Sequence, residues 1–435
     1  MLQHQNRRTF LKNGLIAGTA MLTPISLMKV IAGEGNNRST PNDKIFLGVI
    51  GTGSRGHHLA YLIKEYGHEL GMEVTALCDV YQPHLEHTHA MIPEAKVYND
   101  YRRMLDEATE LHGVIICTPL HVHAGPTIDS LDRGLHVFCE KAMARTLDDT
   151  YAMAEAYYRT GKSLHIGHQR LFDPKFLRGM NKVYNDDLGV VTQIRAYWHR
   201  NNDWRRPVPE GQPELERFIN WRLYRDYSCG LLTELASHHI QVANWAKKAR
   251  PVEVRGTGSI SFWRDGREVE DNVALIFSYD DGTQFIYDSM IQNRRHGLEV
   301  QVLGHKGTLE LETNNFFLEE PPPPPKPAGI VQLLQDLEQN VLGKVPIGSS
   351  SWDPEIAMTY KGESIVADNN TDGTFEQFYG FAKAIREDKP IPGLFEEGYY
   401  ASLWTLLGQQ AIDTGKAVKM PEKYDISKFN PREFV

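Results

Sequence analysis

Cysteine is scarce in this chain, with four residues among 435. Four cysteines are enough for two disulfides in an oxidising compartment, but Cys78, Cys117 and Cys139 each end an apolar run. Small buried side chains are expected at such strand ends, so the sequence predicts free thiols rather than a disulfide framework.

Positive charge is also in short supply, since 47 lysines and arginines stand against 56 aspartates and glutamates and give a net charge of -9. The lysines are scattered and form no basic stripe. This balance argues against binding to nucleic acid or to an anionic membrane surface. It favours a small neutral or modestly polar ligand.

No apolar run suits a permanent membrane span, which needs about 20 strongly apolar residues. The stretch from Leu15 to Ala32 is weakly apolar, contains Gly18, and follows the pair Arg7 and Arg8. This arrangement resembles a twin-arginine signal, the type that exports folded proteins; a chance pair on an N-terminal tail is the alternative. We expect a signal at residues 1–32, a linker at 33–43, and a periplasmic protein without membrane insertion after signal removal.

The remaining chain of about 390 residues is too long for one ordinary core and indicates two domains. In residues 44–168, short apolar runs alternate with amphipathic stretches, as in a doubly wound parallel sheet with helices on both faces. Two expected helices, Ile128–Arg133 and Leu147–Thr160, are followed by Gly134 and Gly161. The expected strands are 45–50, 74–78, 96–98, 114–117, 136–139 and 163–166.

A glycine-rich turn, GTGSRG at 51–56, follows the first expected strand. Gly51 allows a tight turn, Gly53 lets the backbone approach a pyrophosphate, and Gly56 permits close packing of the next helix. Asp79 ends the second strand, where a carboxylate accepts both ribose hydroxyls and repels a 2′-phosphate. The pattern predicts a Rossmann domain that binds NAD rather than NADP; an ordinary helix-capping residue is the alternative for Asp79.

Further motifs follow along the chain, namely TPLHVH at 118–123, HVFCEKAMA at 136–144, IGHQRLFDP at 166–174 and SCGLLTELASHH at 228–239. With the glycine turn, they resemble the Gfo/Idh/MocA oxidoreductases, from about Lys44 to Pro421. In that family the fifth strand is followed by Glu-Lys-Pro, whose lysine touches the nicotinamide side and the substrate hydroxyl. Lys141 matches it, but Ala142 replaces the proline, so a looser backbone is expected there.

The fingerprint and the resemblance together predict twelve NAD contacts. They are Gly51, Gly53, Ser54, Arg55, Gly56, Asp79, Thr118, Pro119, His123, Glu140, Lys141 and Gln169.

Residues 169–421 are expected to form an α+β substrate domain with a large, mainly antiparallel sheet, and 422–435 a C-terminal tail. Related sheets mediate assembly, so the resemblance implies a homo-oligomer, a dimer or a tetramer. Pro321–Pro325 predict an extended spacer. Helices are expected at Phe375–Ile385 and Tyr399–Thr414, and strands at 191–199, 253–262, 272–279, 283–290, 298–303 and 308–311.

Glu234 and His238 lie four residues apart in a predicted helix, Gly230–Ala246, and therefore share one face. In the resembling family a histidine at this position faces the substrate. A histidine near neutrality can remove a hydroxyl proton as hydride leaves the carbon, with Lys141 holding the oxygen and Glu234 orienting substrate or imidazole. His239 points about 100 degrees away. The plainer alternatives are a core histidine, a surface glutamate and a loop lysine.

Aromatic and basic residues cluster between Trp198 and Arg222, as suits stacking and hydrogen bonding to a sugar; core packing is the alternative. His84, His87 and His89 lack the carboxylate or cysteine spacing of a metal site, so no metal is expected. The predicted substrate contacts are Lys141, Arg170, Trp204, Arg205, Glu234 and His238.

The resulting hypothesis is an exported NAD-dependent oxidoreductase that acts on a secondary hydroxyl, at C3, of a sugar or glycoside. A twin-arginine route loads the cofactor during cytoplasmic folding, so it is expected to stay tightly held. Two alternatives stay open, namely a glycosidase that uses NAD for transient C3 oxidation and elimination, and a sugar-binding relative without catalysis.

Overall fold

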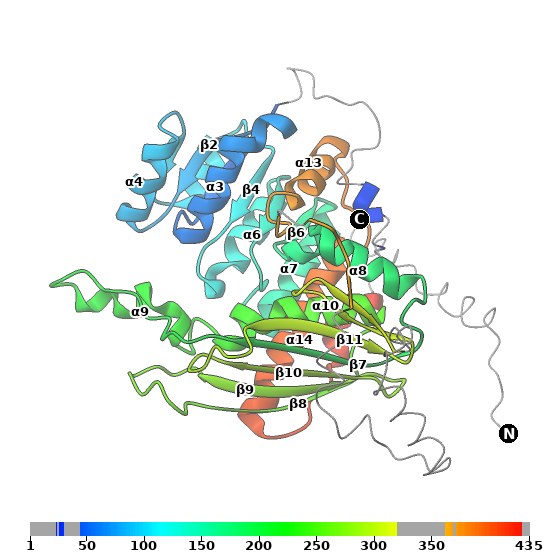
Figure 1. The fold of residues 1–435 in the computed structure, drawn as a ribbon. Helices are drawn as coiled ribbons and strands as arrows, with labels where there is room; N and C mark the ends of the chain where they lie inside the picture. The colour runs from blue at the N-terminus through cyan, green and yellow to red at the C-terminus, as the bar shows by residue number, and fades with distance from the viewer. Residues whose placement is uncertain (1–22, 24–25, 30–43, 320–361, 369–370, 429–435) are drawn as a thin grey trace, which may run out of the picture.

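The structure of the chain is a computed structural model that describes residues 23, 26–29, 44–319, 362–368 and 371–428 (Figure 1). The predicted signal and linker lie almost wholly outside the described residues. Pro321–Pro325 lie outside them as well.

The first sheet has six parallel strands in the order β3-β2-β1-β4-β5-β6. This is the predicted doubly wound arrangement, in which the strand order reverses beside β1 and opens a crevice at the carboxyl edge. The strands are β1 (Ile45–Ile50), β2 (Met72–Cys78), β3 (Lys96–Tyr98), β4 (Gly113–Ile116), β5 (His136–Cys139) and β6 (Leu164–Ile166). The helices are α3 (Ser54–Tyr66), α4 (Gln82–Met91), α5 (Tyr101–Glu107), α6 (Ala124–Asp132) and α7 (Leu147–Thr160).

Local signals explain why some of these bounds were predictable. Helix α7 begins after Thr146, whose hydroxyl accepts a hydrogen bond from the N–H of Asp149, and ends at Gly161, which has a φ of 66°. All four residues of β4 and of β5 are buried, as expected for central strands covered on both faces.

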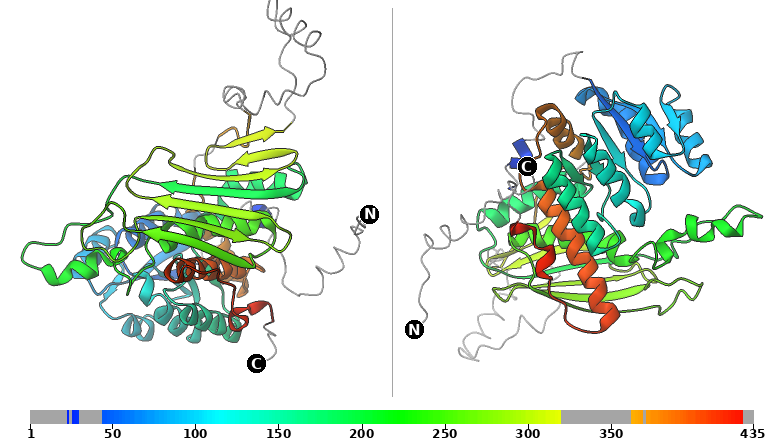
Figure 2. Two further views of the ribbon diagram at one scale, coloured as in Figure 1. Left: turned by 90° about the horizontal axis from the view of Figure 1, so that it is seen from below. Right: turned by 180° about the vertical axis from the view of Figure 1, so that it is seen from behind.

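The second sheet has eight strands in the order β14-β13-β12-β11-β7-β10-β9-β8. Among the described strands of this sheet, only β7 and β10 pair in parallel, so the prediction of a mainly antiparallel sheet is confirmed. Helices α10 and α14 pack on one face, and Figure 2 shows the opposite face without helices. The strands are β7 (Val191–His199), β8 (Glu253–Ser259), β9 (Asn272–Ser278), β10 (Gln284–Met290), β11 (Leu298–Gly304), β12 (Gly307–Glu310), β13 (Asn315–Leu318) and β14 (Glu363–Ser364).

Strand β8 is shorter than the predicted 253–262. The buried carboxylate of Asp271 accepts hydrogen bonds from the N–H groups of Ser261, Phe262 and Trp263 at 2.8 to 2.9 Å. These donors are thereby taken from the sheet ladder, and the chain turns. Strands β13 and β14 were not predicted.

The remaining helices are α8 (Pro174–Tyr184), α9 (Glu216–Ile219), α10 (Ser237–Lys247), α13 (Gln377–Glu387) and α14 (Leu394–Thr414). Helix α13, which the sequence assigned to the second domain, packs against the first sheet instead (Figure 1). Phe378 and Phe381 are fully buried, with ring centroids 5.3 and 5.9 Å from that of Phe138 on β5. The first domain is therefore built from two distant parts of the chain.

Helix α14 joins the domains, because it contacts β6 of the first sheet and β8 of the second. Residues 422–428 of the predicted tail pack onto it, where the Tyr399 hydroxyl donates to the carbonyl of Tyr424 at 2.8 Å. All four cysteines, Cys78, Cys117, Cys139 and Cys229, are unpaired thiols, as predicted. Within the described ranges, no helix has the length and apolar character needed to cross a bilayer.

Candidate active site

A cleft of about 1850 Å³ lies between the two domains. Its first wall comes from the glycine turn and the carboxyl ends of β2, β4 and β5, and its second from residues 198–238. The predicted site residues on these walls are Gly51, Gly53, Ser54, Arg55, Asp79, Thr118, Pro119, His123, Glu140, Lys141, Gln169, Trp204, Arg205, Glu234 and His238. Gly56 and Arg170 are not among the lining residues.

The glycine turn fits a diphosphate. Gly51 has a φ of 89°, and a Cβ there would lie 2.6 Å from the backbone nitrogen of Thr118. At Gly56 a Cβ would lie 1.8 Å from the carbonyl oxygen of Gly51, so this glycine serves packing rather than contact. Helix α3 begins after Gly53 without a side-chain cap and without an acidic residue in its first turn. Its N–H groups and dipole are therefore available to an anion.

Asp79 lies at the end of β2, on the cleft, as predicted for a ribose contact. Its carboxylate accepts hydrogen bonds from the N–H groups of Thr52 at 2.7 Å and Tyr81 at 2.8 Å. Asp79 thus also ties the loop after β2 to the glycine turn.

The two motifs after β4 and β5 are joined by His123. Its ring nitrogens lie 2.8 Å from the carbonyl oxygen of Thr118 and 3.0 Å from that of Ala142. Ala142 is buried, and the peptide bond before it is cis. The His123 ring and the buried position of Ala142 hold this segment in place, and the looser backbone expected from the missing proline stays a prediction.

Glu140 connects the same region to the glycine turn. One carboxylate oxygen accepts from Arg55 Nε at 2.7 Å, and the other accepts from the N–H of Lys141 at 3.2 Å. The side chains of the two cofactor motifs are therefore fixed relative to each other.

The amino group of Lys141 lies 3.0 Å from the carbonyl oxygen of Glu234 and 3.4 Å from that of Thr233. Both belong to a π-helical turn, Leu232–Ala236, that precedes α10. The regular helix predicted over Gly230–Ala246 is thus wrong in its first part. Gly230 has a φ of 54° and packs so tightly on Val269 that a Cβ would come within 2.8 Å, and the chain enters α10 through a wider turn.

Glu234 presents its carboxylate to Arg222, whose Nε donates to it at 2.7 Å. Burial alone would raise the pKa of Glu234, but Arg222 and Lys141 hold that pKa below its usual value. The sequence predicted that Glu234 orients either the substrate or the imidazole of His238. In the structure its carboxylate pairs with Arg222 instead of the imidazole.

His238 is nearly buried beside the cleft, with its ring 5.8 Å from that of Trp198 and 5.9 Å from that of His168. Burial, followed by the positive charges of Lys141 and Arg170, lowers the pKa of His238 well below its usual value. The imidazole is therefore neutral near pH 7 and able to accept a proton, but its pKa lies below the near-neutral value expected from the sequence. His239 is fully buried and does not line the cleft.

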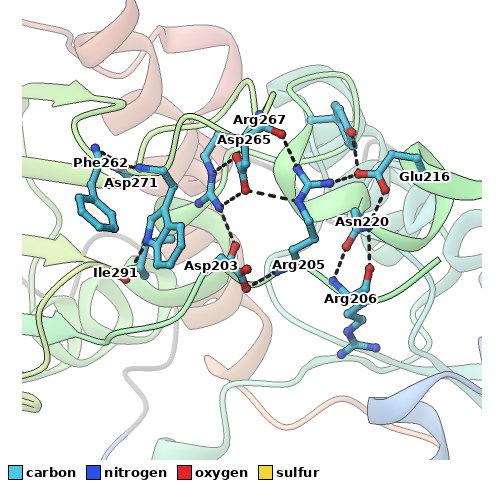
Figure 3. Close-up of polar contacts among 12 residues, drawn as sticks. Asp203, Arg205, Arg206, Glu216, Asn220, Phe262, Asp265, Arg267, Asp271 and Ile291 are labelled. Carbon is cyan, nitrogen blue, oxygen red and sulfur yellow. Dashed lines mark hydrogen bonds and ion pairs between the residues drawn. The ribbon is translucent and has the colours of Figure 1, made fainter. Parts of the chain in front are cut away.

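Two predicted substrate contacts have other partners in the structure. Arg170 is buried, forms an ion pair with Glu312, and lies beneath Trp198 with its guanidinium carbon 5.2 Å from the ring. Arg205 lines the cleft, but its guanidinium pairs with Glu216 and Asp265 (Figure 3). Trp198, Trp204 and Trp221 do line the cleft, as expected for a sugar site.

The cleft also contains residues that the sequence did not assign to the site. Tyr81 follows Asp79, and its place just after the second strand could have marked it. His84, which the sequence considered only as a metal ligand, lines the cleft as well. Arg206 also lines the cleft, and nothing in the sequence separates it from Arg205. In the described part of the chain, no group of three acidic, histidine or cysteine side chains is placed to hold a metal ion.

Two family models match the chain. Residues 45–168 match the oxidoreductase family with an NAD-binding Rossmann fold, and residues 181–310 match the GFO/IDH/MocA C-terminal domain. Together these matches cover more than half of the sequence. The chain belongs to the Gfo/Idh/MocA oxidoreductase family, and its first domain binds NAD.

Individual relatives are distant. The uncharacterized oxidoreductase YrbE of Bacillus subtilis is 24% identical over 289 residues, which cover 63% of this chain and 79% of the relative. Inositol 2-dehydrogenase of Salmonella typhimurium is 26% identical over 274 residues, which cover 61% of this chain and 73% of the relative. A glycosyl hydrolase family 109 protein of Shewanella putrefaciens is 23% identical over 290 residues, which cover 57% of this chain and 62% of the relative.

Solved structures share the fold. An oxidoreductase domain protein from Kribbella flavida has a TM-score of 0.68 at 19% identity, covering 87% of this chain and all of that one. Levoglucosan dehydrogenase in complex with NADH and levoglucosan has a TM-score of 0.66 at 18% identity, with 87% and 100% covered.

Proposed function

We propose that this protein is an NAD-dependent dehydrogenase that oxidises a secondary hydroxyl, at C3, of a sugar or glycoside. The observation that carries the proposal is the placement of Lys141 and His238 on one cleft, at the carboxyl edge of the Rossmann sheet and beyond its glycine turn. A cofactor whose diphosphate lies on that turn extends toward this edge.

Three residues of the chain then have separate roles in the oxidation of the hydroxyl. Bound NAD supplies the hydride acceptor. The neutral imidazole of His238 takes the proton from the substrate hydroxyl, while the ammonium group of Lys141 donates a hydrogen bond to the same oxygen and stabilises its developing negative charge. Glu234, fixed by Arg222, keeps the lysine charged and presents a carboxylate to neighbouring hydroxyls.

A sugar is favoured as substrate by the three tryptophans on the cleft, since flat rings stack on the C–H faces of a pyranose. The names of two similar proteins, inositol 2-dehydrogenase and levoglucosan dehydrogenase, support a polyhydroxylated ring.

Export to the periplasm is part of the proposal and is supported by Arg7, Arg8 and the weakly apolar stretch behind them. Outside the cytoplasm no soluble NAD pool is expected. The hydride must therefore pass to a second substrate or return to the first.

The test is purification of the full chain with its bound cofactor, followed by a screen of sugars and glycosides monitored through nicotinamide absorbance. We expect NADH to form with a subset of sugars and to persist until an acceptor is added. If no sugar reduces bound NAD and none is modified, the dehydrogenase proposal fails.

A redox-neutral glycosidase is the second candidate, and the similarity to a glycosyl hydrolase family 109 protein favours it. In that reaction, oxidation at C3 acidifies the C2 proton, the leaving sugar is eliminated, water adds, and the hydride returns. Release of free aglycone without net NADH would identify it. Sugar binding without either product would instead identify a non-catalytic relative.

A further inference from the structure

An arm of the second domain, residues 203–221 with α9 near its end, extends beneath the first domain (Figure 1). It contributes Arg206, Trp221 and Phe218 to the cleft. The Phe218 ring lies 5.6 Å from that of Tyr81, in the loop after β2. The arm therefore reaches the end of the cleft where Asp79 and the glycine turn lie.

A partly buried polar network fixes the backbone of this arm (Figure 3). Asn220, 2% exposed, accepts a hydrogen bond from the N–H of Arg206 at 2.7 Å and donates to its carbonyl oxygen at 3.1 Å. Asn220 also donates to Glu216 at 3.0 Å, and Glu216 in turn holds Arg205. One amide side chain thus clamps both backbone polar groups of Arg206.

The side chain of Arg206 is left out of that network, and in Figure 3 its guanidinium points away from it. Nη1 donates to Ser54 Oγ at 3.0 Å, which links the second domain to the glycine turn of the first. Arg205 is paired with two carboxylates, whereas no ion pair joins Arg206 to any carboxylate of the described residues.

The carboxylate of Glu234 acts on Arg206 only at longer range and is already paired with Arg222. Burial, together with the nearby charge of Arg222, lowers the pKa of Arg206. The first turn of α3 carries the positive end of a helix dipole and no acidic side chain. A guanidinium and a helix N-terminus thus face the same space, an arrangement that favours a phosphate group between them.

We propose that Arg206 binds the diphosphate of NAD from the side opposite the glycine turn, so that the arm closes over the cofactor and slows its release. This proposal rests on NAD binding by the first domain and does not depend on the sugar substrate.

The test uses Arg206→Gln in the full chain, with Arg264→Gln as matched control. Arg264 is an exposed arginine of the second domain that does not line the cleft. Release of bound NADH is followed by fluorescence, and displacement is measured with ADP-ribose and with adenosine. Loss of one charge-assisted contact is expected to speed release and weaken ADP-ribose by about tenfold. Adenosine has no diphosphate and should bind both proteins within about twofold.

Two outcomes would overturn the proposal: release from Arg206→Gln at the rate of the control, or an equal loss of adenosine and ADP-ribose binding, which would mean that the arm acts by packing. Arg206→Lys keeps the charge, and because lysine binds phosphate as a point charge, this variant is expected to stay within about threefold of the original protein for ADP-ribose. If it is as weak as Arg206→Gln, a role through charge is excluded. Ligand-free melting of each variant separates these effects from misfolding.

Discussion

At the scale of single residues, the amino group of Lys141 is held by two backbone carbonyls of the π-helical turn. Neutral acceptors orient an ammonium group without neutralising it. Burial lowers the pKa of Lys141, and Glu234 opposes that effect. The lysine is therefore positioned to donate to a substrate oxygen while it is still charged.

Replacing Lys141 or His238 by alanine should lower kcat/KM by about 10²- to 10⁴-fold, the usual contribution of a positioned acid or base. Bound NAD should be retained, because the glycine turn is untouched. The control is His239→Leu, one position along and off the cleft. Steady-state kinetics and the NAD content of each variant test this prediction. Normal turnover in Lys141→Ala or His238→Ala would contradict the roles assigned to these residues.

A second residue-scale prediction concerns stability in acid. His165 is buried among Phe138 and Phe172, and burial lowers its pKa from 6.5 to about 3. Between these values the unfolded chain binds a proton that the folded chain does not. The free energy of unfolding should therefore fall by about 1.4 kcal/mol per pH unit below 6.5 from this group alone.

His165→Leu removes this group and should flatten the pH dependence of urea unfolding by about that slope, with little change near neutral pH. An unaltered slope would mean that His165 is protonated in the folded protein.

At this scale the sequence predicted residue types better than partners. Lys141, His238 and the glycine turn were identified because motifs fix their order along the chain. Arg170 and Arg205 were assigned to the substrate, but Glu312 and Asp265, far away in sequence, engage their guanidinium groups. Such long-range pairing leaves no local pattern, and for the same reason Arg206 was missed.

At the scale of elements, the connection from β1 to α3 depends on glycine at 51 and 56. Gly56→Ala would bring a Cβ into the carbonyl of Gly51, so the turn must shift. We expect NAD affinity to fall by at least about tenfold and the melting temperature to drop, since overpacking costs about 1–3 kcal/mol or more. Calorimetric titration with NAD measures the first effect, and undiminished affinity would show that the helix moves away without disturbing the site.

Elements with a strong apolar pattern were predicted nearly to the residue, as in β1 and α7. The π-helical turn was not, because a single wide turn hardly alters the apolar spacing of Gly230–Ala246. The end of β8 was also missed, because it depends on the carboxylate of Asp271, which lies beyond the strand.

At the scale of the whole molecule, α13 completes the first core although it follows the entire second sheet. Phe381→Ala should therefore lower the free energy of unfolding by about 3–5 kcal/mol, as for other buried aromatic truncations. Phe262→Ala is the control, since that ring is 59% exposed, and should change stability by less than about 0.5 kcal/mol. Similar losses in both variants would contradict the packing described for α13.

We expect the outer face of the eight-stranded sheet to form the interface of the predicted homo-oligomer. No helix covers this face in Figure 2, and Ile276 on β9 is 45% exposed. We expect a dimer or tetramer by light scattering, and a lower mass for Ile276→Lys, because a charge is costly in a buried interface. A monomeric original protein would reject this prediction.

The location of α13 also determines the order in which the parts of the first core are synthesised. The ribosome makes β1 and the glycine turn first, but Phe378, Phe381 and Ala382, which close the core beneath them, come near the end of the chain. The core under the sheet that carries the dinucleotide site is therefore complete only after the strands β7 to β14 have been synthesised. We therefore expect stable NAD binding only after α13 has been synthesised and has packed on the first sheet.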